Sequence, residues 1–325
     1  MSTAARTTLV VGEALIDAVD TGSDVIAEHV GGSPANVAFG LGALDHDVAL
    51  LSWFGQDPRG ERIAATCARH GVRIAPGSDG ADHTSVAHAT IDARGQATYH
   101  FDLTWQLPRL ADLGRYGHVH TGSIAATLEP GGSQVLDLIR TVAQRATVSY
   151  DPNIRPTLMG SPDQVRERIE AIVALSDVVK ASDEDLHWLY PGEFVPDVLR
   201  HWMGLGPSLT VVTRGAEGAV YAVRSAGAAQ VTTVPARAGA VVDTVGAGDS
   251  FMAGLVSGLL DAGLLGDSGP SRIGSDGPEG PRARQRLAVA DIDDVQPAVE
   301  RAIRTSGATV ARAGAYAPGR SEIGS

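Results

Sequence analysis

The stretch "DTVGAGDSFMAGL", residues 243–255, places very small residues directly before a carboxylate and an apolar helical pattern. The spacing of the apolar residues that follow predicts a helix beginning near Gly248 or Asp249. The first amides of a helix lack internal partners and carry partial positive charge, so small residues there can surround an oxyanion. Asp249 fits two roles at this position, a general base or a helix cap, and the spacing is compatible with both. The stretch is neither a Walker A loop nor a GxGxxG motif.

Outward from this stretch, strand-like runs alternate with helical patterns. The runs are residues 7–12, 118–124, 146–153, 177–182 and 209–215. This rhythm predicts an α/β fold, a doubly wound and mostly parallel sheet with helices on both faces, in a single domain over residues 1–325. Such sheets bind ligands at the carboxyl ends of their strands, where this chain carries Asp151, Asn153, Lys180 and the run 213–215.

Two further regions depart from this rhythm. Four short strand-like runs near positions 13–31 and 83–104 suggest a small sheet inserted into the larger body. Residues 266–286 are rich in Gly, Pro, Ser and charge, which predicts a disordered surface loop.

Composition excludes several classes of protein. The chain has 325 residues, 43% hydrophobic content and a formal net charge of -12, with no basic stripe, so no nucleic-acid partner is expected. The chain has a single cysteine, Cys67, so an internal disulfide is excluded. We expect Cys67 to be a small buried apolar residue. No signal-peptide pattern or membrane-length apolar run occurs, so we expect a cytoplasmic protein without a membrane partner. The two histidines of "HVHTG", residues 118–122, have the spacing of one face of a strand. We expect them to be structural residues and not metal ligands.

Five motifs together resemble one family. Residues 243–255 resemble the C-terminal signature of the ribokinase-like sugar kinases, and "GGSPANVAFGLGALD", residues 31–45, resembles their N-terminal signature. Three further stretches resemble the fructokinase branch of this family: "DPNIRPTLM" (151–159), "VVKASDEDLHWLYPG" (178–192) and "VVTRGAEGAVY" (211–221). The likeness runs over nearly the whole chain. It implies a kinase that uses ATP and Mg²⁺ to phosphorylate a sugar or nucleoside hydroxyl, with the small sheet as a lid.

The resemblance also implies roles for individual residues. Asp249 matches the catalytic base, and Gly246, Ala247 and Gly248 match the anion hole. The sugar-binding positions are Asp17, Gly31, Gly32, Asn36 and Arg155. The nucleotide-binding positions are Lys180, Ser182, Thr213, Gly215 and Gly218. A monovalent-cation site, for K⁺, would use Asp243 and the carbonyl of Val245. Simpler roles stay open for Asp17 as a hairpin-turn acid, for Gly32 as a helix start and for Arg155 as a surface residue.

One motif departs from the family pattern. Where the family has an Asn-x-x-Glu element that organises magnesium and phosphate, this chain has Ser182 and Asp185. Both side chains offer oxygen to the hydration shell of Mg²⁺, so Asp185 is the expected magnesium residue.

The resulting expectation is an ATP-dependent sugar kinase acting on fructose, with a homodimer formed through the lid. Two other readings stay open. One is a kinase for another sugar, 2-keto-3-deoxygluconate or ribose, although the run 98–107 lacks the arginine that an acidic sugar would need. The other is a catalytically silent sugar-binding regulator on the same fold, which the intact Asp249 and its glycines disfavour.

Overall fold

A computed structural model describes residues 7–20, 26–91, 97–225, 228–237, 239–266 and 283–324. Its main element is a nine-stranded sheet in the order β13-β12-β11-β10-β9-β8-β1-β4-β5. The strands are β1 (Thr7–Val11), β4 (Val48–Leu51), β5 (Val72–Ile74), β8 (Tyr116–Gly122), β9 (Thr147–Asp151), β10 (Val178–Ser182), β11 (Leu209–Thr213), β12 (Ala219–Ser225) and β13 (Ala228–Val234). From β11 to β5 every pair is parallel, whereas β12 and β13 are added antiparallel. The central strands β1, β4, β8 and β9 are buried along their whole length, because helices cover both faces of the sheet.

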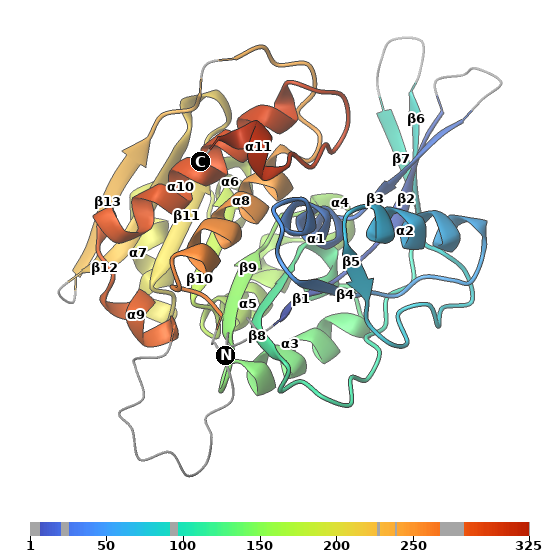
Figure 1. The fold of residues 1–325 in the computed structure, drawn as a ribbon, viewed down its shortest axis with the longest axis horizontal. Helices are drawn as coiled ribbons and strands as arrows, with labels where there is room; N and C mark the ends of the chain where they lie inside the picture. The colour runs from blue at the N-terminus through green and yellow to red at the C-terminus, as the bar shows by residue number, and fades with distance from the viewer. Residues whose placement is uncertain are drawn as a thin grey trace.

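Helices cover both faces of this sheet, which confirms the predicted doubly wound architecture (Figure 1). One face carries α1 (Ser33–Ala43), α2 (Pro58–Arg69), α8 (Ala247–Asp261), α9 (Ala283–Val289) and α10 (Ile292–Val310). The other face carries α3 (Gly131–Val142), α5 (Pro162–Val173), α6 (Asp183–Leu189) and α7 (Val195–Leu205). Short elements are α4 (Pro156–Met159), α11 (Arg320–Ile323) and the 3₁₀ turns η1 (Ser123–Ala126) and η2 (Gly215–Glu217).

A second sheet of four strands stands off the main body, as Figure 1 shows. Its order is β3 (Ala27–Gly31), β2 (Leu15–Asp20), β6 (Val86–Ile91) and β7 (Ala97–Asp102). The β2–β6 pair is parallel and the two outer pairs are antiparallel. Glu28 ties this lid sheet to α2, since its two carboxylate oxygens lie 2.6 Å from Arg59 Nη2 and from Arg62 Nη1.

The prediction of a disordered loop over 266–286 is wrong at its C-terminal end. Residues 283–286 form the first turn of α9, because Ala283 and Leu287 are buried on the domain and Arg284 forms a bidentate pair with Asp177. Residues 267–282 of the predicted loop lie outside the described part of the chain.

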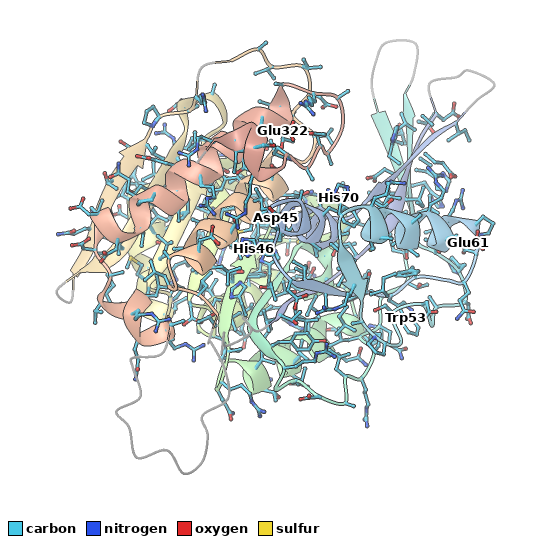
Figure 2. All side chains as sticks on the ribbon, in the orientation of Figure 1. Asp45, His46, Trp53, Glu61, His70 and Glu322 are labelled. Atoms are coloured by element: carbon cyan, nitrogen blue, oxygen red, sulfur yellow. The ribbon has the colours of Figure 1, made fainter. Side chains whose placement is uncertain are left out.

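The C-terminal helix α11 packs near the end of α1. Asp45 and His46, labelled in Figure 2, lie at the turn after α1. Arg320 of α11 contacts this turn. Arg320 donates to the carbonyl of Leu44 at 2.7 Å and pairs with Asp45 at 3.6 Å. Within the described ranges, no helix is long and apolar enough to cross a membrane.

The two histidines of β8 are fully buried inside the domain. His118 contacts the hydroxyls of Thr147 and Ser149 at 2.9 Å each, and His120 contacts Ser149 at 3.0 Å. Burial lowers the pKa of both imidazoles to about 3, so both are neutral at physiological pH. Among the residues described, no group of three His, Cys, Asp or Glu side chains is arranged to hold a metal ion.

Candidate active site

The strand order of the main sheet reverses at one point, and the region outside the carboxyl ends of the strands there is called the crevice below. From β1 the chain moves first to β4 and β5 on one side and then to β8 and β9 on the other, so the order reverses between β1 and β8. Ligands of doubly wound folds bind outside the carboxyl ends of the strands at such a switch point. The N-terminal ends of α1 and α8 meet there, beneath the lid sheet (Figure 1).

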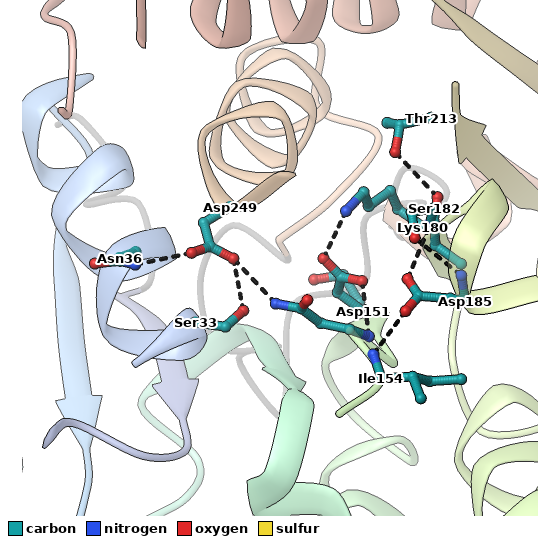
Figure 3. Close-up of polar contacts among 12 residues, drawn as sticks. Ser33, Asn36, Asp151, Ile154, Lys180, Ser182, Asp185, Thr213 and Asp249 are labelled. Carbon is teal, nitrogen blue, oxygen red and sulfur yellow. Dashed lines mark hydrogen bonds and ion pairs between the residues drawn. The ribbon is translucent and has the colours of Figure 1, made fainter. Parts of the chain in front are cut away.

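Asp249 lies in the first turn of α8 and is 7% exposed. Its Oδ1 accepts hydrogen bonds from Ser33 Oγ at 2.7 Å and from Asn153 Nδ2 at 3.2 Å. Its Oδ2 accepts one from Asn36 Nδ2 at 2.8 Å (Figure 3). Three side-chain donors, two from α1 and one from the loop after β9, therefore hold the carboxylate. The cap position of α8 belongs to Gly246.

The glycines before Asp249 shape the head of α8. Gly246 has a left-handed backbone with φ of 73°, and a Cβ added there would lie 2.6 Å from the Cβ of Ala315. The amide of Ala247 donates to the carbonyl of Thr244 at 3.2 Å, so this predicted member of the anion hole has a partner within the turn. The amides of Gly248 and Asp249 follow in the first helical turn, where a helix supplies no internal acceptor.

A buried ion pair lies directly behind this helix head. Lys180 Nζ is 2.9 Å from Asp151 Oδ2, and the two side chains are 3% and 0% exposed (Figure 3). A Cβ added to Gly248 would lie 3.1 Å from the same Nζ. Burial acts to lower the pKa of Lys180, but the charges of Asp151 and its neighbouring carboxylates outweigh it and raise it. Lys180 is therefore a fixed positive charge beneath the amides.

Asp185 is bound on both oxygens. Its Oδ2 accepts from the amide of Ser182 at 2.8 Å, and its Oδ1 accepts from the amide of Ile154 at 2.7 Å (Figure 3). Ser182 Oγ accepts the amide of Asp185 at 3.0 Å, which completes a capping box on α6. Because the side chain of Asp is one methylene shorter than that of Glu, this carboxylate stays close to the backbone.

The predicted sugar residues gather under the lid. Asp17 is exposed on β2, and a Cβ added to Gly31 would lie 2.0 Å from its Oδ2, so glycine leaves room for this carboxylate. Partial desolvation raises the pKa of Asp17, and the charge of Asp249 adds to this, while the charges of Arg155 and His29 lower it. Asn36, predicted to contact the sugar, donates to Asp249.

Two glycine positions near the crevice are dictated by backbone geometry. Gly32 has φ of 104° and a Cβ there would lie 2.4 Å from the carbonyl oxygen of Glu13. Gly218, after the η2 turn, has φ of 91° and would place a Cβ 2.0 Å from the carbonyl oxygen of Val234. Thr213 ends β11 beside η2, so three of the predicted nucleotide residues, Thr213, Gly215 and Gly218, lie in or next to one turn. The other two, Lys180 and Ser182, belong to β10, the strand that pairs with β11.

The predicted cation residues lie in the loop that leads into α8. Asp243 Oδ1 accepts from the amide of Val245 at 3.0 Å, and Oδ2 accepts from the amide of Gly314 at 2.8 Å. These backbone hydrogen bonds lower the pKa of Asp243. The side chain of Val245 is exposed, and the loop joins two distant segments near the helix head.

Three residues near the site were not among the predicted site residues. The cap position of α1 is Gly32, and the hydroxyl of Ser33, the next residue, donates to Asp249. Asn153 was noted only as a strand-end residue. Glu13 is buried, accepts a hydrogen bond from the amide of Ala125 at 3.2 Å, and has its pKa raised by burial to about 7. A carboxylate directly after the buried run of β1 was the available signal for Glu13.

Asp249 is a buried acid in the first turn of a helix, and the buried cation Lys180 lies behind that turn. This arrangement is expected of an enzyme that transfers a phosphoryl group to a hydroxyl. Comparison with known proteins agrees with this class. Residues 6–273 match the pfkB family of carbohydrate kinases, and the chain belongs to that family.

Sequence relatives support the same assignment, and a solved structure shares the fold. The chain is 33% identical over 264 residues to a fructokinase of Klebsiella pneumoniae, covering 78% of this chain and 85% of the relative. It is 34% identical over 265 residues to a fructokinase of Rhizobium leguminosarum bv. trifolii, covering 78% and 80%. A double mutant of the Vibrio cholerae O395 fructokinase, solved with fructose, ADP and potassium ion, has a similar fold, with a TM-score of 0.77 at 24% identity over 99% and 98% of the two chains.

Proposed function

We propose that this protein is an ATP-dependent kinase of D-fructose with Asp249 as its general base. The observation that carries the proposal is the Asp249 carboxylate, which is buried in the first turn of α8 and held by donors from α1 and from the loop after β9. The relatives named fructokinase, at about one-third identity, support fructose as the sugar.

The proposed chemistry needs positioning and charge stabilisation more than covalent catalysis. Asp249 takes the proton of the attacking sugar hydroxyl, which we assign to the primary hydroxyl at position 6. The amides of Gly248 and Asp249 and the buried charge of Lys180 then stabilise the negative charge of the phosphoryl group being transferred. Asp17 accepts hydrogen bonds from the other sugar hydroxyls, and the lid sheet keeps water from the transferring group.

Metal ions fit this site in a specific way. Mg²⁺ usually keeps several waters and is bound through substrate phosphates with one or two carboxylates. Each oxygen of Asp185 holds one backbone amide and keeps a second lone pair, so Asp185 and Ser182 would hold metal-bound water rather than the ion itself. When bound, Mg²⁺ neutralises charge on the nucleotide phosphates. The loop of Asp243 and Val245 would hold K⁺.

A coupled assay of ADP release tests this proposal. The panel comprises D-fructose, ribose, glucose, adenosine and 2-keto-3-deoxygluconate, each with ATP and Mg²⁺. We expect the highest kcat/KM for fructose, because hydrogen-bonding groups such as Asp17 are left unpaired by sugars that lack matching hydroxyls.

Other results of the same assay would distinguish the alternatives. Faster turnover of ribose or of the keto-deoxy acid would refute fructose and leave the kinase assignment standing. If every sugar bound without ADP release, the protein would be a sugar-binding regulator and the kinase proposal would be wrong.

A further inference from the structure

Asn153 has an unusual backbone for a residue other than glycine. Its φ is 38°, in the left-handed region that asparagine tolerates better than most side chains. Two buried carboxylates hold this turn: Asp151 Oδ1 accepts from the Asn153 amide at 3.2 Å, and Asp185 Oδ1 accepts from the Ile154 amide at 2.7 Å. Strained backbone that is over-determined in this way concentrates at functional sites.

The side chain of Asn153 joins two groups of the crevice. Its Nδ2 lies 3.2 Å from Asp249 Oδ1, and its Oδ1 lies 2.7 Å from Arg155 Nη1. The guanidinium of Arg155 can only donate hydrogen bonds, so the amide oxygen of Asn153 must face Arg155. The amide nitrogen must then face Asp249, which as a carboxylate can only accept. The orientation of the amide is therefore fixed by its partners.

We propose that Asn153 is a positioning residue that sets the orientation of Asp249 and couples it to Arg155. This inference rests on the proposed role of Asp249 as the base. Arg155 is exposed in the crevice, and its charge acts on the sugar-facing Asp17. A sugar that contacts Arg155 therefore affects the hydrogen bond between Arg155 and the side-chain amide of Asn153. Through that amide it affects the position of the Asp249 carboxylate. Asp185 gains a defined role, because it holds the turn that presents Asn153.

This role explains why the position carries asparagine. Glycine would accept the left-handed backbone but would leave Asp249 Oδ1 with Ser33 as its side-chain partner. Aspartate would keep the size of the side chain but would place a second carboxylate about 3.2 Å from the base. Only an amide of this length satisfies both the carboxylate and the guanidinium.

Three variants separate positioning from a purely structural role. Asn153→Gly relieves the backbone strain and removes the amide, whereas Asn153→Ala removes the amide and keeps the strain. We expect both to lower kcat by about 10–100-fold, the cost of misplacing a catalytic group, with KM for ATP unchanged. Asp45 also has a left-handed backbone, with φ of 62°, far from the crevice, so Asp45→Ala is the matched strain control and should keep the wild-type kcat.

The third variant, Asn153→Asp, gives a readout that a structural role would not move. A second negative charge beside the base makes its ionised form less favourable, so the acid limb of the kcat–pH profile should move to higher pH by about one unit. The titration of the Asp249 carboxyl followed by ¹³C NMR should move in the same direction, and this measurement does not need turnover.

Each outcome decides one question. If Asn153→Gly keeps the wild-type kcat, or if Asn153→Asp leaves both the NMR titration and the acid limb in place, the positioning role is wrong. If the NMR titration moves but the Asp249→Asn variant turns over like the wild type, the contact stands and the proposed base is wrong.

Discussion

Lys180 and Asp151 illustrate how much of this site depends on single residues. Both side chains are buried at the sheet edge, and their 2.9 Å contact offsets the cost of removing two charges from water. The lysine is therefore a buried cation and not a surface one. Its position behind Gly248 makes it a source of positive potential for the helix head.

Replacing Lys180 separates this electrostatic role from stability. Lys180→Met should lower the free energy of unfolding by about 3 kcal/mol, because it leaves the Asp151 carboxylate buried without its partner. The double variant Lys180→Met with Asp151→Asn should recover part of that stability but not kcat, as measured by urea unfolding and the ADP-release assay. Recovery of kcat in the double variant would show that the lysine is only structural.

Asp17 gives the opposite kinetic pattern. Asp17→Asn removes a charged acceptor for sugar hydroxyls, a contact of about 1.5–3 kcal/mol, so KM for the sugar should rise by roughly 10–100-fold. We expect kcat at saturating sugar to change little, because this contact exists before and during the reaction. An unchanged KM would make Asp17 a turn residue of the lid.

At the scale of elements, the head of α8 decides where the base and the amides lie. Gly246→Ala should lower the free energy of unfolding by about 2 kcal/mol and reduce kcat, because alanine resists the left-handed backbone and its Cβ would meet Ala315. Gly71→Ala is a matched control, with φ of 67° and no atom within 4 Å of the added Cβ. Equal losses in unfolding free energy and in kcat for the two variants would contradict a special role for this turn.

The periodicity of the sequence was enough to predict α8, the main strands and the small sheet, because each depends on the local spacing of apolar residues. The doubly wound architecture and the place of Asp249 at the start of a helix could also be predicted from the sequence. The hydrogen-bond partners of Asp249 could not, because they come from positions 96 to 216 residues away in the chain. The α9 helix was missed because its few buried residues follow a Gly- and Pro-rich run that dominated the composition.

At the scale of the whole molecule, buried histidines couple stability to pH. Burial lowers the pKa of His46 to about 4 and of His118 and His120 to about 3, against 6.5 in the unfolded chain. Below pH 6.5 the unfolded chain binds protons that the folded protein excludes, so acid lowers the free energy of unfolding. Glu13, with its pKa raised from 4.5 to about 7, has the opposite effect. Its contribution to the free energy of unfolding is present at low pH and is lost as pH rises through about 7.

Replacing one buried histidine should reduce by one the number of protons that the chain takes up when it unfolds in acid. Between pH 6 and 5, His46→Gln should reduce the slope of unfolding free energy against pH by about 1.4 kcal/mol per pH unit, measured by urea unfolding. Glutamine can keep a hydrogen bond with Ser257, the 2.8 Å partner of His46. An unchanged slope in His46→Gln would mean that this imidazole is protonated in the folded state.

The most direct test of the account is the rate of ADP release by Asp249→Asn with ATP and fructose, measured beside the fructose affinity of the same variant. A general base acts mainly in the transition state, so the account predicts a fall in kcat of roughly 10²–10⁴-fold with fructose affinity largely retained. A variant that turns over at nearly the wild-type rate would contradict the assignment of Asp249 as the base.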